Sequence, residues 1–150
     1  MDLIIQKLTR PALTGNIDQF IDILKDVPGE YWKADHFLKD LPGKFQVSCC
    51  AFTGDKLAGY IISTTTNSSS AHIHKFMIES ELRNKKIGQR LLSFFENLVR
   101  KINISIITLN VNEDNADAIR FYKRYGFEVE SKCLDTKNSN VLLKMKKLIK

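Results

Sequence analysis

The segment from Phe76 to Arg90 limits the folds open to this chain more than any other part of its sequence. A strand-like run over residues 76–78 is followed by a short polar loop, and an amphipathic helix pattern starts directly after the loop. Between positions 83 and 90 there is no acidic residue, but there are four cations, Arg83, Lys85, Lys86 and Arg90. Because the first N–H groups of a helix lack intrahelical partners and the helix dipole is positive there, this segment predicts a diphosphate site. The alternative is a solvated basic helix start.

The rest of the chain alternates between strand-like and helical patterns, with no repeat and no linker. The predicted elements are a strand over 3–8, helices over 17–24 and 31–41, strands over 45–52, 57–65 and 72–78, a helix over 87–99, a strand over 105–111, a helix over 118–125 that Gly126 ends, and strands over 127–134 and 141–145. The order is β-α-α-β-β-β-α-β-α-β-β. It predicts a mixed α/β fold (α+β mixed), with a mostly antiparallel sheet flanked by helices. Pro-Gly pairs after the first two helices suggest a mobile lid over a pocket.

Composition places the chain among globular proteins and narrows its partners. Its 150 residues suit one domain, 1–150, and 23 Lys and Arg against 17 Asp and Glu give a net charge of +6, which suits an anionic ligand or nucleic acid. No apolar run approaches the ~18 residues of a membrane span, so we expect no membrane partner. Three cysteines, Cys49, Cys50 and Cys133, make a poor disulfide framework. They indicate a reducing, cytoplasmic location.

A second informative segment follows the predicted strand over 105–111. Asn115 and Tyr122 are seven residues apart, which is two helical turns, so both side chains face the same way. The same helix is expected to end at Gly126, since glycine is the residue favoured just after a helix C-terminus.

Together the two segments resemble the GNAT acetyltransferase superfamily. The residues Arg83-Asn84-Lys85-Lys86-Ile87-Gly88 resemble the family's [Arg/Gln]-x-x-Gly-x-[Gly/Ala] pyrophosphate loop. The helix from Asn115 to Tyr122, closing with Tyr125-Gly126-Phe127, resembles its second motif. Lys86 departs from the pattern because it stands where the family usually has a glycine. A side chain there narrows the approach of the backbone to phosphate and disfavours a positive φ.

The resemblance implies an N-acetyltransferase that moves an acetyl group from acetyl-CoA, a cosubstrate, to a primary amine in a ternary complex. It implies that the strand before the loop bulges and splays from its neighbour, exposing an N–H for the thioester oxygen. Tyr122 would protonate the departing thiolate, and Asn115 would contact the pantetheine arm. The implied cofactor-binding residues are Phe76, Met77, Ile78, Arg83, Asn84, Lys85, Lys86, Ile87, Gly88, Asn115 and Tyr122.

Two histidines are the main candidates for the general base; Glu79 and Glu81 lie closer to the loop and are otherwise expected to be solvated. His72 and His74 alternate on one strand, so we expect both rings on the same face as Phe76 and Ile78. Either could be the base, directly or through a water, and the alternative is a histidine satisfied at the sheet surface. No metal is expected from Cys49 and Cys50 with these histidines, because adjacent cysteines face opposite ways and the two strands lie roughly 10 Å apart.

The acceptor is a small-molecule or peptide amine. An amine of low pKa is favoured because no clear carboxylate base is visible. The leading alternative is a catalytically weak or inactive CoA-binding sensor or subunit, which Lys86 favours and Tyr122 disfavours. A nucleic-acid-binding module is disfavoured because the chain has no stacking-aromatic or recognition-helix pattern. Either a monomer or a homodimer fits the sequence. Trp32, with Tyr31 and Phe37, is expected to pack in the lid or to form a wall of the acceptor pocket.

Overall fold

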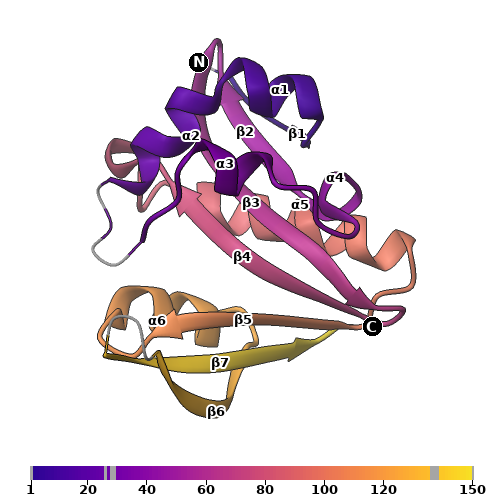
Figure 1. The fold of residues 1–150 in the computed structure, drawn as a ribbon, viewed down its shortest axis with the longest axis vertical. Coiled ribbons are helices and arrows are strands. Elements are labelled where there is room, and N and C mark those ends of the chain that lie inside the picture. The colour runs from indigo at the N-terminus through magenta and orange to yellow at the C-terminus, as the bar shows by residue number, and fades with distance from the viewer. Residues whose placement is uncertain (1, 26, 28–29, 136–138, 150) are drawn as a thin grey trace.

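The computed structural model describes residues 2–25, 27, 30–135 and 139–149. Seven strands of this part of the chain form one sheet in the order β1-β2-β3-β4-β5-β7-β6, with helices on both faces (Figure 1). The elements are β1 (Leu3–Lys7), α1 (Arg10–Gly15), α2 (Ile17–Leu24), α3 (Ala34–Leu38), α4 (Lys44–Val47), β2 (Cys49–Thr53), β3 (Lys56–Asn67), β4 (Ser70–Ile78), the 3-10 turn η1 (Ser80–Leu82), α5 (Ile87–Lys101), β5 (Ile106–Asn112), α6 (Ala116–Arg124), β6 (Glu128–Asp135) and β7 (Asn140–Leu148). The predicted mixed, mostly antiparallel sheet flanked by helices is confirmed.

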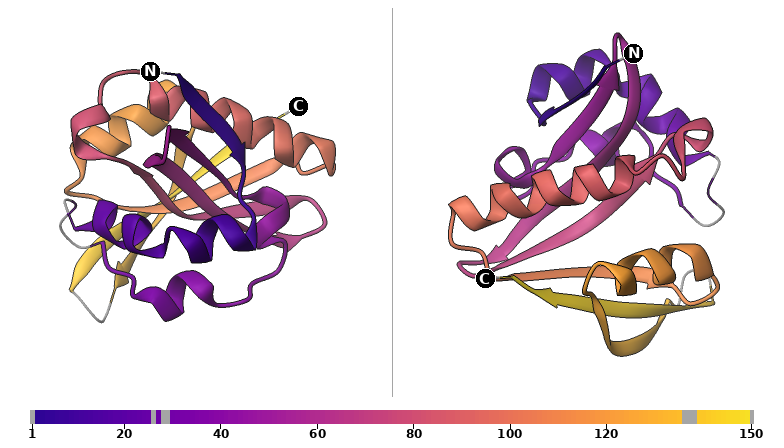
Figure 2. Two further views of the ribbon diagram at one scale, coloured as in Figure 1. Left: turned by 90° about the horizontal axis from the view of Figure 1, so that it is seen from above. Right: turned by 180° about the vertical axis from the view of Figure 1, so that it is seen from behind.

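Each face of the sheet carries its own apolar cluster. On one face α5 buries Leu91, Phe95 and Val99, at the three- and four-residue spacing that makes one stripe of a helix. On the other face α2 and α3 bury Phe20 and Phe37 against β3. Figure 2 shows α5 and α6 on one side of the sheet and α1, α2 and α3 on the other. We call these the α5 face and the α3 face.

The sheet parts at its only parallel pairing among the described residues. β4 pairs with β5 over four residue pairs, from Ser70 with Ile106 to Ile73 with Leu109. Beyond that point β4 runs on to Ile78 and β5 to Asn112 without pairing to each other. Figure 1 shows the two strands diverging from the end near the C-terminus. The splay that the resemblance implied is therefore present.

A β-bulge lies in β4 next to the point where the strands part. Ile62 of β3 is opposite Lys75, but its neighbour Ser63 is opposite Ile73, so His74 is an extra residue on β4. An extra residue shifts the two-residue alternation of side chains by one position.

The bulge makes one prediction wrong. His72 and His74 do lie together, with ring centroids 4.9 Å apart. Phe76 and Ile78, however, pack with the α5 cluster, while Met77 is buried in the cluster of the α3 face. The two histidines therefore face the α3 side, opposite to Phe76 and Ile78. The simple alternation from residue 72 to 78 does not hold across the bulge.

Two predicted elements between residues 31 and 52 also differ. Only Ala34–Leu38 of the expected helix over 31–41 is helical, and the expected strand over 45–52 starts at Cys49 because Lys44–Val47 forms α4. Gly43, with a φ of 69°, precedes α4, and a Cβ there would lie 2.7 Å from the Thr65 side chain. This close approach to β3 turns the chain into a helical turn before the strand begins. Pro28 and Gly29 of the expected lid, and residues 136–138 of the last turn, lie outside the described residues.

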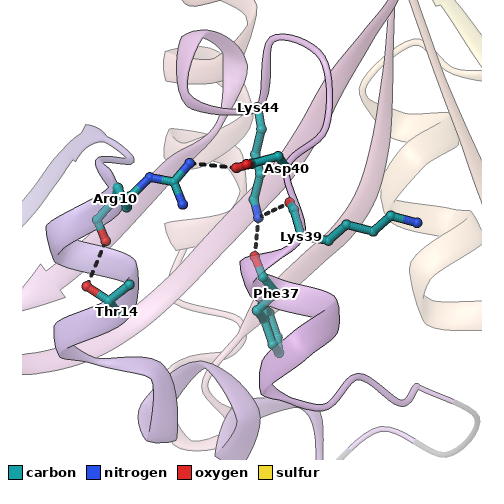
Figure 3. A network of polar contacts seen from close by, with 6 residues as sticks. All are labelled: Arg10, Thr14, Phe37, Lys39, Asp40 and Lys44. Atoms are coloured by element: carbon teal, nitrogen blue, oxygen red, sulfur yellow. Dashed lines mark hydrogen bonds and ion pairs between the residues drawn. The ribbon is translucent and has the colours of Figure 1, made fainter.

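A buried lysine fixes the end of α3. Lys44 is 3% exposed, and its ammonium group donates to the carbonyl oxygens of Phe37 and Lys39 (Figure 3). Next to it, Asp40 pairs with Arg10 of α1 at 2.6 Å. Burial, and then the charge of Arg10, lower the pKa of Lys44. These contacts tie α3 to α1 and α4 and hold it over the α3 face.

Candidate active site

The start of α5 carries free donors and unpaired cations. The first backbone hydrogen bond of the helix runs from the Arg90 N–H to the Lys86 carbonyl, so the N–H groups of residues 87–89 have no backbone acceptor in the described chain. Lys85, Lys86 and Arg90 are exposed and make no ion pair with described residues. The first turn of α5 contains no acid. Arg83 alone is tied back, through Nε to the Ile78 carbonyl at 3.2 Å. This arrangement can bind an anion of the size of a diphosphate.

The loop before α5 contains two residues in the left-handed region. Asn84 has a φ of 64° and Lys86, the N-cap residue, a φ of 65°. Asparagine tolerates this conformation, whereas for a lysine it costs about 1–2 kcal/mol. The position that resembles a family glycine thus keeps a positive φ, although a lysine side chain disfavours it. At Gly88 a Cβ would lie 3.3 Å from the ring of Phe121, so this glycine allows α5 to pack closely on α6.

The edge of β4 that faces β5 has backbone groups without strand partners. The Glu79 N–H donates to the Ala58 carbonyl at 2.8 Å, so Glu79 faces β3. Alternate residues of an antiparallel pair face the same neighbour, so Met77 also faces β3 while Phe76 and Ile78 direct their N–H and carbonyl groups into the gap. The expected exposed N–H groups are therefore present in this gap between β4 and β5.

Tyr122 borders the same gap from α6. Its ring packs near Phe76, with centroids 6.1 Å apart, and near Phe127 at 5.5 Å. The residue is 9% exposed and its hydroxyl has no hydrogen-bond partner in the described chain. Since no fully buried side-chain oxygen or nitrogen of the described residues lacks a partner, this hydroxyl reaches solvent. Burial, and then the charge of Glu30, raise the pKa of Tyr122, so the phenol keeps its proton at neutral pH.

Asn115 is the N-cap of α6. Its side-chain oxygen accepts the Ala118 N–H at 3.2 Å, which leaves the Nδ2 hydrogens for any other contact. Residues 123–127 close the helix as predicted. Gly126 has a φ of 98°, and the Phe127 N–H donates to the Tyr122 carbonyl at 2.9 Å. The cap at one end and the glycine at the other set the position of Tyr122.

On the α3 face the two histidines are held by threonines of the neighbouring strands. His72 Nδ1 lies 2.7 Å from Thr108 Oγ1 of β5, and His74 Nε2 lies 2.9 Å from Thr64 Oγ1 of β3. Burial, followed by the charges of His74 and Lys144, lowers the pKa of His72 to about 4. Burial, followed by Lys75 and Lys44, also lowers the pKa of His74. Both imidazoles are therefore neutral at neutral pH.

An ion pair that the sequence reading missed stands beside these histidines. Lys75 of β4 pairs with Glu30, and its ammonium lies 5.3 Å from the centroid of the Trp32 ring. Trp32 also packs near His74, at 6.4 Å between ring centroids. Glu30 and Lys75 are 45 residues apart, and no local motif signals their contact. Trp32 thus lies on the side of the histidines, which is where a wall of the acceptor pocket, one of its two expected roles, would have to be.

The two adjacent cysteines are buried in the apolar clusters. Cys49 is buried in the cluster of the α5 face and Cys50 in that of the α3 face. Burial raises the pKa of both thiols, to about 12 for Cys50, so neither is a ready nucleophile. Within the described residues, no group of three or more His, Cys, Asp or Glu side chains could hold a metal ion.

The structure thus combines a sheet that parts between two parallel strands with a basic helix start beside the gap. The sequence profile of the "Acetyltransferase (GNAT) family" matches residues 17–127, and the chain belongs to this family. It is 31% identical over 96 residues to the L-amino acid N-acetyltransferase AaaT of Escherichia coli (strain K12). That match covers 62% of this chain and 59% of AaaT.

Solved structures agree with the fold. Ard1 from Thermoplasma volcanium superposes with a TM-score of 0.85 at 22% identity, covering 100% of this chain and 99% of that one. The PaiA N-acetyltransferase from Thermoplasma acidophilum, in complex with coenzyme A, has a TM-score of 0.73 at 22% identity and covers 99% of this chain and 100% of that one. Among the described residues no helix is both long enough and apolar enough to cross a membrane.

Proposed function

We propose that this chain is a single-domain, acetyl-CoA-dependent N-acetyltransferase that moves an acetyl group directly to a primary amine in a ternary complex. The observation that carries the proposal is the gap between β4 and β5. It brings together the backbone groups of Phe76 and the N–H of Ile78, which have no strand partner, the free N–H groups at the start of α5 and the hydroxyl side of Tyr122. Each of these groups suits a different part of an acyl-CoA.

The diphosphate would lie at the start of α5. The N–H groups of residues 87–89 would donate to phosphate oxygens, with Lys85, Lys86 and Arg90 adding charge around them. The backbone groups of Phe76 and the N–H of Ile78 would hold the amide-containing pantetheine arm, and the Nδ2 group of Asn115 would contact the same arm. The donors present in this structure therefore fit the ligand chemically.

When bound, acetyl-CoA supplies an acetyl group already activated as a thioester. A backbone N–H of β4 would stabilise the thioester oxygen, a contribution of about 3 kcal/mol for one such donor. The Tyr122 hydroxyl would give its proton to the departing sulfur. An ordinary phenol near ~10 is about 1.5 pKa units weaker as an acid than a thiol near ~8.5. The raised pKa of Tyr122 keeps the proton in place beforehand and makes its transfer to the sulfur more uphill than this difference.

The acceptor we favour is an α-amine. At neutral pH the deprotonation of a lysine-like amine near ~10.4 costs about 4.6 kcal/mol, against about 1 kcal/mol for an α-amine near ~7.8. Neutral histidines with lowered pKa values are weak bases, so the smaller cost suits them. The relative AaaT is named for L-amino acids, which also carry an α-amine, although its pKa is higher than that of a peptide α-amine.

The test is an acetyl-transfer screen across amino acids, peptides, amino sugars and polyamines, with the released thiol detected. Acetyl-CoA binding is measured in parallel by calorimetry. Transfer to an α-amine is expected. Tight binding with no transfer to any amine class would instead support the alternative of a CoA-binding sensor or subunit, which the unfavourable backbone of Lys86 favours.

A further inference from the structure

The bulge in β4 puts one side chain at the point where the sheet opens. His74 is the extra residue on β4, and it directly follows Ile73, the last residue that pairs with β5. Its ring lies on the α3 face, whereas Tyr122 borders the gap from the α5 face. An acceptor that meets the acetyl group from the side opposite to α5 would therefore pass His74.

One nitrogen of His74 is fixed and the other is available. Nε2 is 2.9 Å from the Thr64 hydroxyl, which sets the plane of the ring. Nδ1 has no hydrogen-bond partner in the described part of the chain, and the residue is exposed. The Trp32 ring lies 6.4 Å away between centroids, so His74 stands beside an aromatic side chain with one nitrogen open. This is the arrangement that a proton acceptor for an incoming group needs.

His72 has a different environment. Its Nδ1 is held by Thr108 at 2.7 Å, in the section where β4 and β5 are still paired. It is less exposed than His74 and stands behind it, with ring centroids 4.9 Å apart. Its position suits a residue that orients His74 rather than one that meets the acceptor.

Burial, and then the charges around the pair, keep both rings neutral. Lys75 on the same strand and Lys44 from α4 face His74, and Lys144 from β7 faces His72. Glu30 is paired with Lys75, and Glu130 with Lys144. On the far side of Trp32, His36 stacks on the indole at 6.3 Å. Cations thus face the histidines directly, while the acids Glu30 and Glu130 are paired with those cations.

We propose that His74 is the general base of the transfer and that its Nδ1 takes the proton of the acceptor amine. The inference rests on the proposed function. The amine nitrogen forms the new C–N bond with its lone pair, the C–S bond breaks, the amine proton passes to His74 Nδ1, and the proton of the Tyr122 hydroxyl passes to the sulfur. The products are the amide and the free thiol, and both protons are returned through solvent.

The experiment compares the wild type, His74→Gln and His36→Gln on acceptor amines graded in pKa. His36 is exposed and its Nδ1 accepts the Lys33 N–H at the start of α3, a contact that glutamine can replace, so it is a matched control. For His74→Gln, kcat/KM should fall about 10²-fold on an amine of high pKa and only a few-fold on one of low pKa. A merely structural role would lower both equally. Acetyl-CoA affinity should stay within twofold of the wild type.

The pH profile gives a second readout. Because the pKa of His74 is lowered from 6.5, the acid limb of kcat/KM should lie below pH 6.5 in the wild type and be lost in His74→Gln. Thr64→Val, which removes the partner of Nε2, should shift that limb and lower kcat with little change in acetyl-CoA affinity. A wild-type enzyme that transfers acetyl while His74→Gln matches it on every amine would overturn the assignment of His74 alone. A wild type that transfers to no amine would overturn both proposals.

Discussion

At the scale of single residues, the two sides of β4 hold groups in opposite protonation states. Burial raises the pKa of Tyr122 on the α5 face, so it carries its proton, and lowers the pKa values of His72 and His74 on the α3 face, so they carry none. Neighbouring groups whose pKa values are pushed apart are the pattern expected of an acid and a base that act on one bond. The strand between them separates the two roles.

The acid role of Tyr122 predicts a specific loss. Tyr122→Phe keeps the ring against Phe76 and Phe127 but removes the proton, so folding and acetyl-CoA affinity should barely change while kcat falls roughly 10²-fold. Tyr125→Phe is the control, because this tyrosine lies one residue before Gly126 at the end of α6 and should keep most activity. Steady-state kinetics on the true acceptor measure both. If Tyr125→Phe loses activity and Tyr122→Phe does not, the roles are reversed.

The backbone of Lys86 predicts a gain. At a φ of 65° a glycine avoids the steric cost of the lysine side chain, so Lys86→Gly should raise the free energy of unfolding by about 1 kcal/mol. It should keep or improve acetyl-CoA affinity. Chemical denaturation and calorimetry give the two quantities. A large loss of affinity would mean instead that the ammonium group is a required phosphate ligand.

At the scale of elements, the start of α5 predicts a salt-dependent ligand. Replacing Arg83 and Lys85 with alanine should weaken acetyl-CoA binding at least tenfold and flatten its dependence on ionic strength, because exposed charges act through a screened field. Lys101→Ala, in the last turn of the same helix, is the matched control and should leave the affinity unchanged. Titration calorimetry at two salt concentrations measures the acetyl-CoA affinity of each variant and its dependence on ionic strength. Unchanged affinity in the double variant would place the ligand elsewhere.

The elements that the sequence predicted are those with local signals. The stripe of α5 and the glycine that ends α6 each depend on residues close in sequence, and the structure has them. The bulge at His74 has no such signal, since its register depends on β3. Likewise position 43 needs a glycine because Thr65, 22 positions later, lies 2.7 Å from where a Cβ would stand. The Glu30–Lys75 pair could not be predicted for the same reason, because its two residues are 45 positions apart in the sequence.

At the scale of the whole molecule, the sheet consists of two parts joined by a short seam. β1 to β4 form one part and β5, β7 and β6 the other, and four residue pairs connect them. His72 lies within this seam, where Thr108 of β5 bonds its ring. The protonation of one histidine therefore bears on the contact between the two parts.

This arrangement predicts how stability depends on pH. The pKa of His72 is lowered from 6.5 to about 4 in the folded chain, so between these values the unfolded chain binds a proton that the folded chain does not. The contribution of His72 to the free energy of unfolding is therefore present above pH 6.5 and is lost as the pH falls through 4. The whole loss is on the order of 3 kcal/mol. Denaturation at several pH values should show a flatter curve for His72→Gln. Parallel curves would mean that His72 titrates alike in both states.

The gap between β4 and β5 also bears on aggregation. Outer edge strands invite pairing with other chains, and β6 carries the usual protection: Glu128, Glu130 and Lys132 with an irregularity between Val129 and Ser131. The open edge of β4 has the reverse composition, because residues 76–78 are Phe-Met-Ile and carry no charge. Such a segment on the rim of a sheet would be a hazard for self-association. Here the segment lies in the middle of the sheet, with β3 on one side and the β5–β7 part on the other. An apolar strand edge can therefore stay unpaired without being open to the strands of other chains.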